Sequence, residues 1–296
     1  MVSVVIQGGA MRSIYCLGAI RALTEGPHVS HIESIHVASA GCISGMVLAS
    51  RLTAANTATV SEMGESLVAR LAGPRFIDQR RVRKVVDVDY LVAVTREVTS
   101  VTVEHLKSRS LSFEVALTNA ENGSAAYRDV SKAPSDDALY EALRATMAIP
   151  VLYPTRVTIG GVPYIDGGIA DPLPVMKAFE RTPKMVIAIS NVAAGTLGEE
   201  AVGREAKILR YAPGISARVR SLMLARNPLA DMVDNLLNRS EFCGVRIVRI
   251  SPSNPELLGH RLETDHGKLM ALEDLGYRDA VHALSQARDT ETEVRA

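Results

Sequence analysis

The sequence has no excess of charge of either sign, because its 33 lysines and arginines balance its 33 aspartates and glutamates. A chain without net charge has no overall electrostatic field that would draw it to nucleic acid. We therefore expect no nucleic-acid partner. The balance of charge does not constrain the substrate, which has to be inferred from local motifs.

Cysteine is scarce: the chain has Cys16, Cys42 and Cys243. Their spacing matches no metal-binding pattern, and an odd number of widely scattered cysteines argues against a disulfide framework. We expect a reduced, cytoplasmic setting and no bound metal. Cys42, one helical turn after Ser39, is expected to be a small packing residue and not a nucleophile.

Long apolar segments are missing as well. No uninterrupted apolar run approaches the roughly 20 residues that span a bilayer, and the N-terminus has neither the basic region nor the cleavage site of a signal peptide. The sequence predicts a soluble protein that is at most peripheral to a membrane surface. Two basic stretches, residues 80–84 and 204–226, would suit anionic head groups or, alternatively, form solvated helix faces over the core.

No Pro-, Gly- or Ser-rich linker divides the 296 residues, of which 47% are hydrophobic, so we expect one domain over residues 1–296. Apolar runs typical of strands alternate with segments of helical periodicity. The alternation predicts an α/β protein with three layers, α/β/α, around a mostly parallel sheet. Strands are expected at residues 2–6, 32–38, 111–118, 126–130, 156–159, 162–165, 184–190 and 244–250. Helices are expected at residues 13–23, 41–54, 136–147, 174–180 and 268–287, and residues 55–103 and 204–237 are expected to be mostly helical.

Ser39 lies where the expected strand 32–38 runs directly into a helix that begins at Gly41. A sharp strand-to-helix turn around a serine is typical of a nucleophile elbow, which exposes the hydroxyl beside the free N–H groups of the new helix. The alternative is that Ser39 only caps the helix, the commonest role of a serine at a helix start.

Two glycine-rich motifs accompany the elbow. Gly8-Gly9-Ala10-Met11-Arg12 follows the first strand, and Asp166-Gly167-Gly168 follows a hairpin. Ligands of parallel α/β sheets bind beyond the carboxyl ends of the strands, where both Gly8-Gly9 and Ser39 fall. A glycine pair there also suits a nucleotide, but this one lacks the Gly-x-Gly-x-x-Gly spacing and a following Lys-Ser or Lys-Thr. Asp166-Gly167 could alone be a turn.

These residues together have the chemistry of acyl transfer, which needs a nucleophile, a base and donors for the oxyanion. Ser39 would be the nucleophile and Asp166 the base, in a dyad without histidine. Because an ordinary carboxylate is a weak base, the dyad requires a dry pocket that raises the basicity of Asp166. The N–H groups of Gly9-Ala10-Met11 would hold the oxyanion, and Arg12 would position the loop or neutralise a lipid phosphate.

In order and spacing, the motifs resemble those of the patatin-like phospholipase family, closest to its bacterial soluble branch. That family has Gly-Gly-Gly-x-Arg-Gly after the first strand, Gly-x-Ser-x-Gly at the elbow and Asp-Gly-Gly or Asp-Gly-Ala at the catalytic acid. Here the corresponding stretches are residues 8–13, 37–41 and 166–168, and the likeness extends to residues 143–150, 171–175 and 275–280.

The resemblance implies a patatin-like fold and a serine acyl hydrolase of the phospholipase A or lipid esterase type, which acts on a lipid or small ester without a metal or organic cofactor. It also implies which residues form the site. These are catalytic Ser39 and Asp166, an oxyanion hole at Gly8, Gly9, Ala10, Met11 and Arg12, and supporting glycines Gly41, Gly167 and Gly168.

The sequence departs from the family pattern at three positions. Val37 replaces the first glycine of the elbow, Ala10 the third glycine of the loop, and Ser13 the glycine after the arginine. Val37 is expected to crowd the turn and Ala10 to add strain, so that glycine at either position would raise turnover and lower stability. The alternative is a catalytically weak or inactive relative that binds an acyl chain or a protein partner.

Three histidines, His28, His31 and His36, lie close to Ser39 in the sequence, and a serine hydrolase triad would use one. His36 belongs to the strand that leads into the elbow, but three residues along a strand places it on the opposite face. We expect these histidines to be structural.

Overall fold

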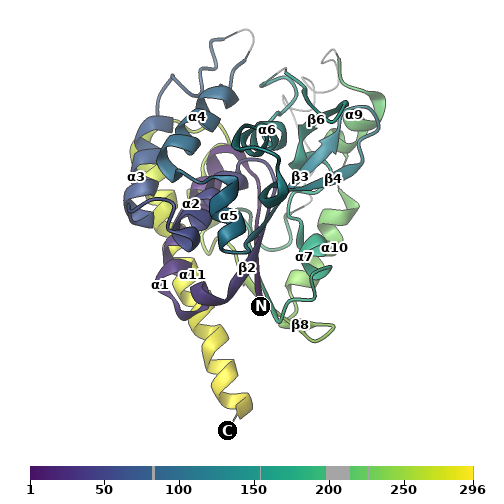
Figure 1. Cartoon of the computed structure of the whole chain (residues 1–296). Coiled ribbons are helices and arrows are strands. Elements are labelled where there is room, and N and C mark those ends of the chain that lie inside the picture. Colours follow the sequence, from purple (N-terminus) through teal and green to yellow (C-terminus); the bar gives the residue numbers. More distant parts are fainter. Residues whose placement is uncertain (82–83, 154, 198–213, 226, 296) are drawn as a thin grey trace.

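The computed structural model describes residues 1–81, 84–153, 155–197, 214–225 and 227–295. Figure 1 shows a central sheet with helices on both faces, which confirms the three-layer α/β/α architecture predicted from the alternating pattern. Within the described residues, one sheet contains nine strands: β1 Val2–Ile6, β2 Ile32–Val37, β3 Ser112–Asn119, β4 Ala125–Asp129, β5 Val157–Ile159, β6 Val162–Asp166, β7 Met185–Ile189, β8 Glu241–Phe242 and β9 Val245–Ile250.

The sheet is mostly parallel at its centre and antiparallel at its margins. Its strand order is β5-β6-β3-β2-β1-β7-β9-β8, and β4 also pairs with β3. Strands β3, β2, β1, β7 and β9 run parallel, whereas β4, β6 and β8 pair antiparallel to their neighbours. The predicted hairpins β3–β4 and β5–β6 are confirmed. The carboxyl ends of the parallel strands therefore meet at one edge, where a ligand is expected to bind.

Helices cover the two faces of the sheet unequally (Figure 1). The larger layer contains α1 Ile14–Glu25, α2 Gly41–Thr53, α3 Val60–Leu71, α4 Val88–Thr99, α5 Val103–Ser108 and the long α11 His266–Arg295. The other face carries α7 Val175–Phe179 and α10 Pro228–Leu237, while α6 Asp136–Thr146 lies above the sheet edge and α9 Ala217–Leu224 lies beside β6.

Strand β1 shows how the core is divided between the two layers. Val4 and Ile6 belong to the cluster of the larger helical layer, whereas Val5 belongs to the smaller cluster formed with α7 and α10. Side chains alternate between the faces of a strand, so a strand such as Val2–Ile6, in which all five residues are buried, is covered on both sides.

The segment 55–103 is less helical than predicted. Thr59 caps α3 in a capping box with Glu62, and Asp87 caps α4 by accepting from the Tyr90 N–H. Between these helices, the described residues 72–81 and 84–87 are irregular and are called the strap below, because Gly73-Pro74 ends α3. A single antiparallel bridge, Ile77 to Val86, holds the strap together.

Candidate active site

Ser39 occupies a strained turn between β2 and α2. Its φ is 49°, a left-handed conformation that is uncommon for residues other than glycine. The N–H of Ser39 donates to Thr146 Oγ1 on α6 at 2.8 Å, which fixes the turn. Ala40 is the N-cap of α2, and no side chain caps that helix. Ser39 therefore does not serve as a helix cap, and its hydroxyl points elsewhere.

Asp166 lies beside Ser39 because of the sheet register. Val37, the last residue of β2, pairs with Val115 of β3, and two residues further along β3 Leu117 pairs with Asp166. Ser39 lies two residues beyond Val37, so it reaches the same level of the sheet. Ser39 Oγ donates to Asp166 Oδ2 at 2.6 Å, and the two side chains are 5% and 4% exposed.

The Asp166 carboxyl group is held from several sides. Its Oδ1 accepts from the Gly168 N–H at 2.8 Å, and its main-chain carbonyl accepts from Thr118 Oγ1 at 2.7 Å. Burial raises the pKa of Asp166 to about 7, against the lowering effects of the Ser39 and Gly168 hydrogen bonds and of the positive charge of Arg261. A carboxylate with this pKa can accept a proton near neutral pH.

Three glycines around the site have no room for a side chain, because other atoms of the chain approach them closely. A Cβ on Gly8 would lie 2.5 Å from Ser39 Cβ, and one on Gly41 would lie 2.5 Å from the Gln7 carbonyl oxygen. At Gly167 the same atom would lie 2.0 Å from the Ala116 carbonyl oxygen. Any side chain at these positions would push the loop, the elbow and the Asp166 turn apart.

The glycine-rich loop offers fewer free donors than expected. The Met11 N–H donates to the Arg261 carbonyl at 3.1 Å and the Arg12 N–H to the Gly9 carbonyl at 3.2 Å. Within the described part of the chain, the N–H groups of Gly9 and Ala10 donate to no other residue. Of the three N–H groups expected to face an oxyanion, that of Met11 is therefore engaged within the chain.

Ala10 has a φ of 51°, so the strain expected from alanine at this position is present in the folded chain. The adjoining 3₁₀ turn, Ala10–Ser13, leads directly into α1. A left-handed alanine next to a left-handed Ser39 concentrates backbone strain on both sides of the same site.

A loop after the last parallel strand braces the glycine-rich loop. Arg12 donates from Nε and Nη2 to the Gly259 carbonyl at 3.1 and 3.0 Å, which favours a positioning role for Arg12. Together with the Met11 contact to Arg261, this ties residues 259–261 to the site. No motif in residues 259–261 predicts this contact, although a loop beyond the carboxyl end of β9 lies where ligand sites of such sheets occur.

Asn191 also holds the glycine-rich loop in place. It follows β7 and donates from Nδ2 to the Gly8 carbonyl at 2.9 Å, while its own N–H donates to Gln7 Oε1 at 2.8 Å. The sequence predicts no contact for Asn191. Thr146 lies within the family-like residues 143–150, but local sequence does not indicate that its side chain reaches Ser39.

An apolar cavity opens beside Ser39. Its total empty volume, including the part open to solvent, is about 570 Å³. Its walls come from the glycine-rich loop, the elbow, α1, α2, the end of α3, the start of α4, the strap and the segment that follows α6. Among the lining residues are Ala10, Ile14, Leu17, Ile43, Phe76 and Met147.

Val37 does not crowd the elbow, contrary to expectation. It is fully buried, and it does not line the cavity. Instead it packs toward α2 above Gly45, where a Cβ would lie 2.8 Å from Val37 Cγ1. The missing side chain of Gly45 therefore makes the room that Val37 needs.

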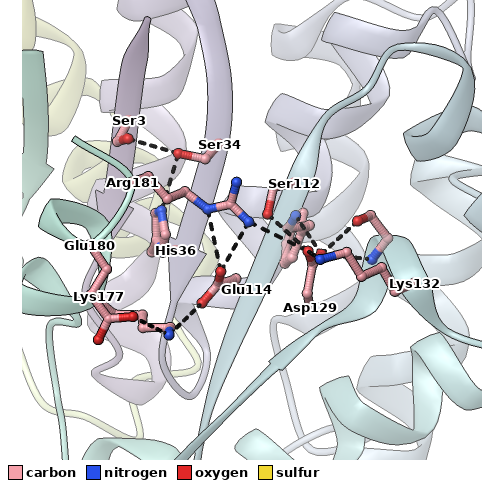
Figure 2. Close-up of polar contacts among 12 residues, drawn as sticks. Ser3, Ser34, His36, Ser112, Glu114, Asp129, Lys132, Lys177, Glu180 and Arg181 are labelled. Atoms are coloured by element: carbon pink, nitrogen blue, oxygen red, sulfur yellow. Dashed lines mark hydrogen bonds and ion pairs between the residues drawn. The ribbon is translucent and has the colours of Figure 1, made fainter. Parts of the chain in front are cut away.

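The histidines near the elbow lie away from Ser39. His28 and His31 belong to the 3₁₀ turn Pro27–His31, at the opposite end of β2. His36 lies in a polar cluster under α7, where its Nε2 is 3.1 Å from Ser34 Oγ (Figure 2). Burial and the charges of Arg181 and Lys177 lower the pKa of His36 to about 3, so the ring is neutral. These placements agree with the expected structural role.

Cys42 and possible metal ligands were also located in the part of the chain that the structure describes. Cys42 is fully buried, and burial raises its pKa, as expected of a packing residue. Among the same residues, no three His, Cys, Asp or Glu side chains are grouped to hold a metal ion.

The two basic stretches are only partly described. Residues 82–83, 198–213 and 226 lie outside the described residues, and with them much of both stretches. In the first stretch, Arg80 and Arg81 form ion pairs with Asp78 at 3.0 and 4.0 Å. No described helix is both long and apolar enough to cross a membrane.

A buried serine–carboxylate pair beside an apolar cavity, at the carboxyl edge of an α/β/α sheet, defines the class of the fold and its site. The model of the patatin-like phospholipase family matches residues 4–179, more than half of the chain. The chain belongs to the patatin-like phospholipase family.

Two individual proteins show more limited similarity. The uncharacterized protein YjjU of Escherichia coli (strain K12) is 36% identical over 59 residues, which are 20% of this chain and 16% of that protein. Among solved structures, VipD from Legionella pneumophila is similar over 96% of this chain and 66% of its own, with 14% identity and a TM-score of 0.47. This chain therefore spans only part of the length of both proteins.

Proposed function

We propose that this protein is a serine acyl hydrolase of the phospholipase A or lipid esterase type, with Ser39 as nucleophile and Asp166 as base. The observation that carries the proposal is the 2.6 Å hydrogen bond from Ser39 Oγ to Asp166 Oδ2 at the mouth of an apolar cavity. The raised pKa of Asp166, to about 7, supports a base that is ionised yet able to hold a proton at neutral pH.

In the first half of the reaction, Ser39 Oγ attacks the ester carbonyl carbon while its proton passes to Asp166 Oδ2. The carbonyl oxygen becomes an oxyanion that accepts from the Gly9 and Ala10 N–H groups. As this intermediate collapses, the bond to the leaving alcohol breaks, and the alcohol oxygen takes the proton from Asp166. The acyl group stays on Ser39.

In the second half, water attacks the acyl carbonyl and gives its proton to Asp166. The bond to Ser39 Oγ then breaks, Ser39 recovers its proton from Asp166, and a carboxylic acid leaves. Because Asp166 first accepts and then donates, the reaction requires only one acid–base group. The acyl chain would lie in the apolar cavity, whose walls include Ile14, Leu17 and Ile43.

A matched pair of proteins tests the proposal. Nitrophenyl esters of short and medium acyl chains and a phospholipid should be hydrolysed by the wild type and not by Ser39→Ala. Esterase activity that survives in Ser39→Ala would contradict it. A wild type that stabilises on adding a fatty acid but hydrolyses no ester would favour the alternative of a binding-only relative, which the engaged Met11 N–H supports by leaving fewer oxyanion donors.

We propose in addition that residues 1–296 act as one acyl hydrolase domain, because a single sheet carries Ser39, Asp166 and the loop 259–261. The free thiols of Cys16, Cys42 and Cys243 support a reducing, cytoplasmic location. Contact with a membrane would be peripheral and limited to substrate uptake. Flotation with anionic vesicles at low and high salt tests this contact, since electrostatic binding weakens as salt rises.

A further inference from the structure

Asn191 presents the two ends of its side-chain amide differently to the glycine-rich loop. Its Nδ2 donates to the Gly8 carbonyl at 2.9 Å and to the Gln7 carbonyl at 3.4 Å. In the described part of the chain its Oδ1 has no hydrogen-bond partner, although Asn191 is only 1% exposed. A buried acceptor without a partner is uncommon in native proteins, so this one needs an explanation.

The hydrogen bond to the Gly8 carbonyl sets the direction of the next N–H group. The described chain contains no cis peptide bond, so the peptide between Gly8 and Gly9 is trans. In a planar trans peptide the C=O and N–H bonds point in opposite directions. Because the Gly8 carbonyl points at Asn191, the Gly9 N–H points away from Asn191. This N–H is one of the two that the proposed reaction assigns to the oxyanion.

Asn191 and the nucleophile contact the two glycines directly. A Cβ on Gly9 would lie 2.5 Å from Asn191 Oδ1, and a Cβ on Gly8 would lie 2.5 Å from Ser39 Cβ. Neither glycine has a side chain that restricts its dihedral angles, so the peptide between them can rotate. After such a rotation the Gly9 N–H would face Asn191 Oδ1, the acceptor that has no partner in the present orientation.

We propose that Asn191 is a positioning residue that directs the Gly9 N–H to the oxyanion by holding the Gly8 carbonyl. This inference rests on the proposed acyl hydrolase function and deepens its account of the oxyanion hole. Asn191 does not line the cavity, so it acts through the glycine-rich loop. An aspartate at the same position has no donor when ionised. It would accept from the Gly9 N–H and favour the rotated peptide.

Kinetics of Asn191→Asp with two esters test the inference. On nitrophenyl butanoate we expect kcat to fall about 100-fold with KM nearly unchanged, which is the usual cost of one oxyanion donor. The second substrate is the matching thionoester, whose C=S sulfur accepts hydrogen bonds only weakly. Its kcat should fall much less, so the ratio of the two rates should drop by about tenfold or more. The charge of the new aspartate acts on both esters alike and cancels from this ratio.

Two further variants complete the kinetic test. Ser190→Ala is the matched control, because Ser190 is fully buried beside Asn191 but donates to Gln7 Oε1 at 2.8 Å instead of to the glycines. Ser190→Ala should keep the wild-type rate ratio even if it lowers stability. Asn191→Leu has a similar size, no charge and no donor, and it should lower the ratio even if Asn191→Asp does not fold. A ratio unchanged in the folded Asn191 variants would overturn the inference and leave the proposed function intact.

A crystal structure of Asn191→Asp provides a readout that does not require turnover. The peptide between Gly8 and Gly9 should be rotated, with the Gly9 N–H within hydrogen-bond distance of the new carboxylate. A peptide in the wild-type orientation would overturn the inference. If the wild type hydrolyses no ester, the proposed function fails, and the orientation of this peptide then decides whether Asn191 positions it.

Discussion

Thr146 accepts a hydrogen bond from the Ser39 N–H at 2.8 Å and donates its own hydroxyl to the Ala116 carbonyl at 2.7 Å. The fully buried threonine on α6 thereby joins the strained elbow to strand β3. Since Ser39 has a positive φ, the turn needs such an external support to keep its conformation.

Replacing Thr146 by valine keeps the side-chain shape but removes both hydrogen bonds. We expect a loss of about 1–3 kcal/mol in the free energy of unfolding, because the Ser39 N–H and the Ala116 carbonyl lose their partner. Turnover should fall by at least about tenfold, since the nucleophile is no longer held in place. Thr146→Ser, which keeps the hydroxyl, is the control. Urea unfolding and ester kinetics measure both effects, and a Thr146→Val enzyme as active as Thr146→Ser would refute this role.

The activity of the wild type should depend on the ionisation of Asp166. The base must be deprotonated, and burial raises its pKa to about 7. We therefore expect kcat/KM to rise about tenfold per pH unit below that value and to level off above it. A pH profile on a small neutral ester measures this limb. An acid limb centred near the ordinary carboxyl pKa of about 4 would show that Asp166 is not perturbed in the working enzyme.

The raised pKa of Asp166 should also lower the free energy of unfolding at high pH. Its folded pKa is raised from 3.8 to about 7, so its favourable contribution is complete below about pH 4 and is lost as the pH rises through 7. Asp166→Asn cannot ionise, and its stability relative to the wild type should increase by roughly 3–4 kcal/mol between about pH 4 and pH 8. Urea unfolding at both pH values checks this. A difference in the free energy of unfolding that stays the same at both pH values would show that ionisation of Asp166 does not destabilise the folded protein.

Glycine substitutions at Ala10 and Val37 should have opposite effects, although the sequence alone predicts a loss of stability for both. At Ala10 the φ of 51° costs an alanine about 1–2 kcal/mol, which glycine relieves and its greater freedom in the unfolded chain partly offsets. Ala10→Gly should thus be as stable as the wild type or up to about 1 kcal/mol more so. Thermal or urea unfolding of Ala10→Gly and the wild type measures this difference. A clear loss of stability in Ala10→Gly would mean that residue 10 does not hold a left-handed conformation.

Val37→Gly should lose about 3 kcal/mol or more without gaining activity, because it removes a fully buried side chain that does not line the cavity. Gly45→Ala in the same background provides the control. In the wild type a Cβ at Gly45 would meet Val37 Cγ1 at 2.8 Å and Phe113 Cζ at 2.9 Å, so removing Val37 should make Gly45→Ala less harmful. Equal costs of Gly45→Ala in both backgrounds would exclude this contact.

Local patterns predicted the layers, the hairpins and the elbow, because apolar periodicity and turn residues act over short stretches of chain. They could not predict contacts that depend on the register of distant strands. Three such contacts are the hydrogen bond from the Ser39 N–H to Thr146, the hydrogen bond from Arg12 to the Gly259 carbonyl, and the packing of Val37 on Gly45. The hydrogen bond from the Met11 N–H to the Arg261 carbonyl has the same origin, since the two residues lie far apart along the chain.

The most direct test of the account is covalent labelling with a fluorophosphonate, followed by peptide mass spectrometry. The probe should modify Ser39 in the wild type, no residue in Ser39→Ala, and Ser39 about a thousandfold more slowly in Asp166→Asn, which lacks the base. Modification of a different residue, or labelling of Asp166→Asn at the wild-type rate, would contradict a nucleophilic Ser39 activated by Asp166.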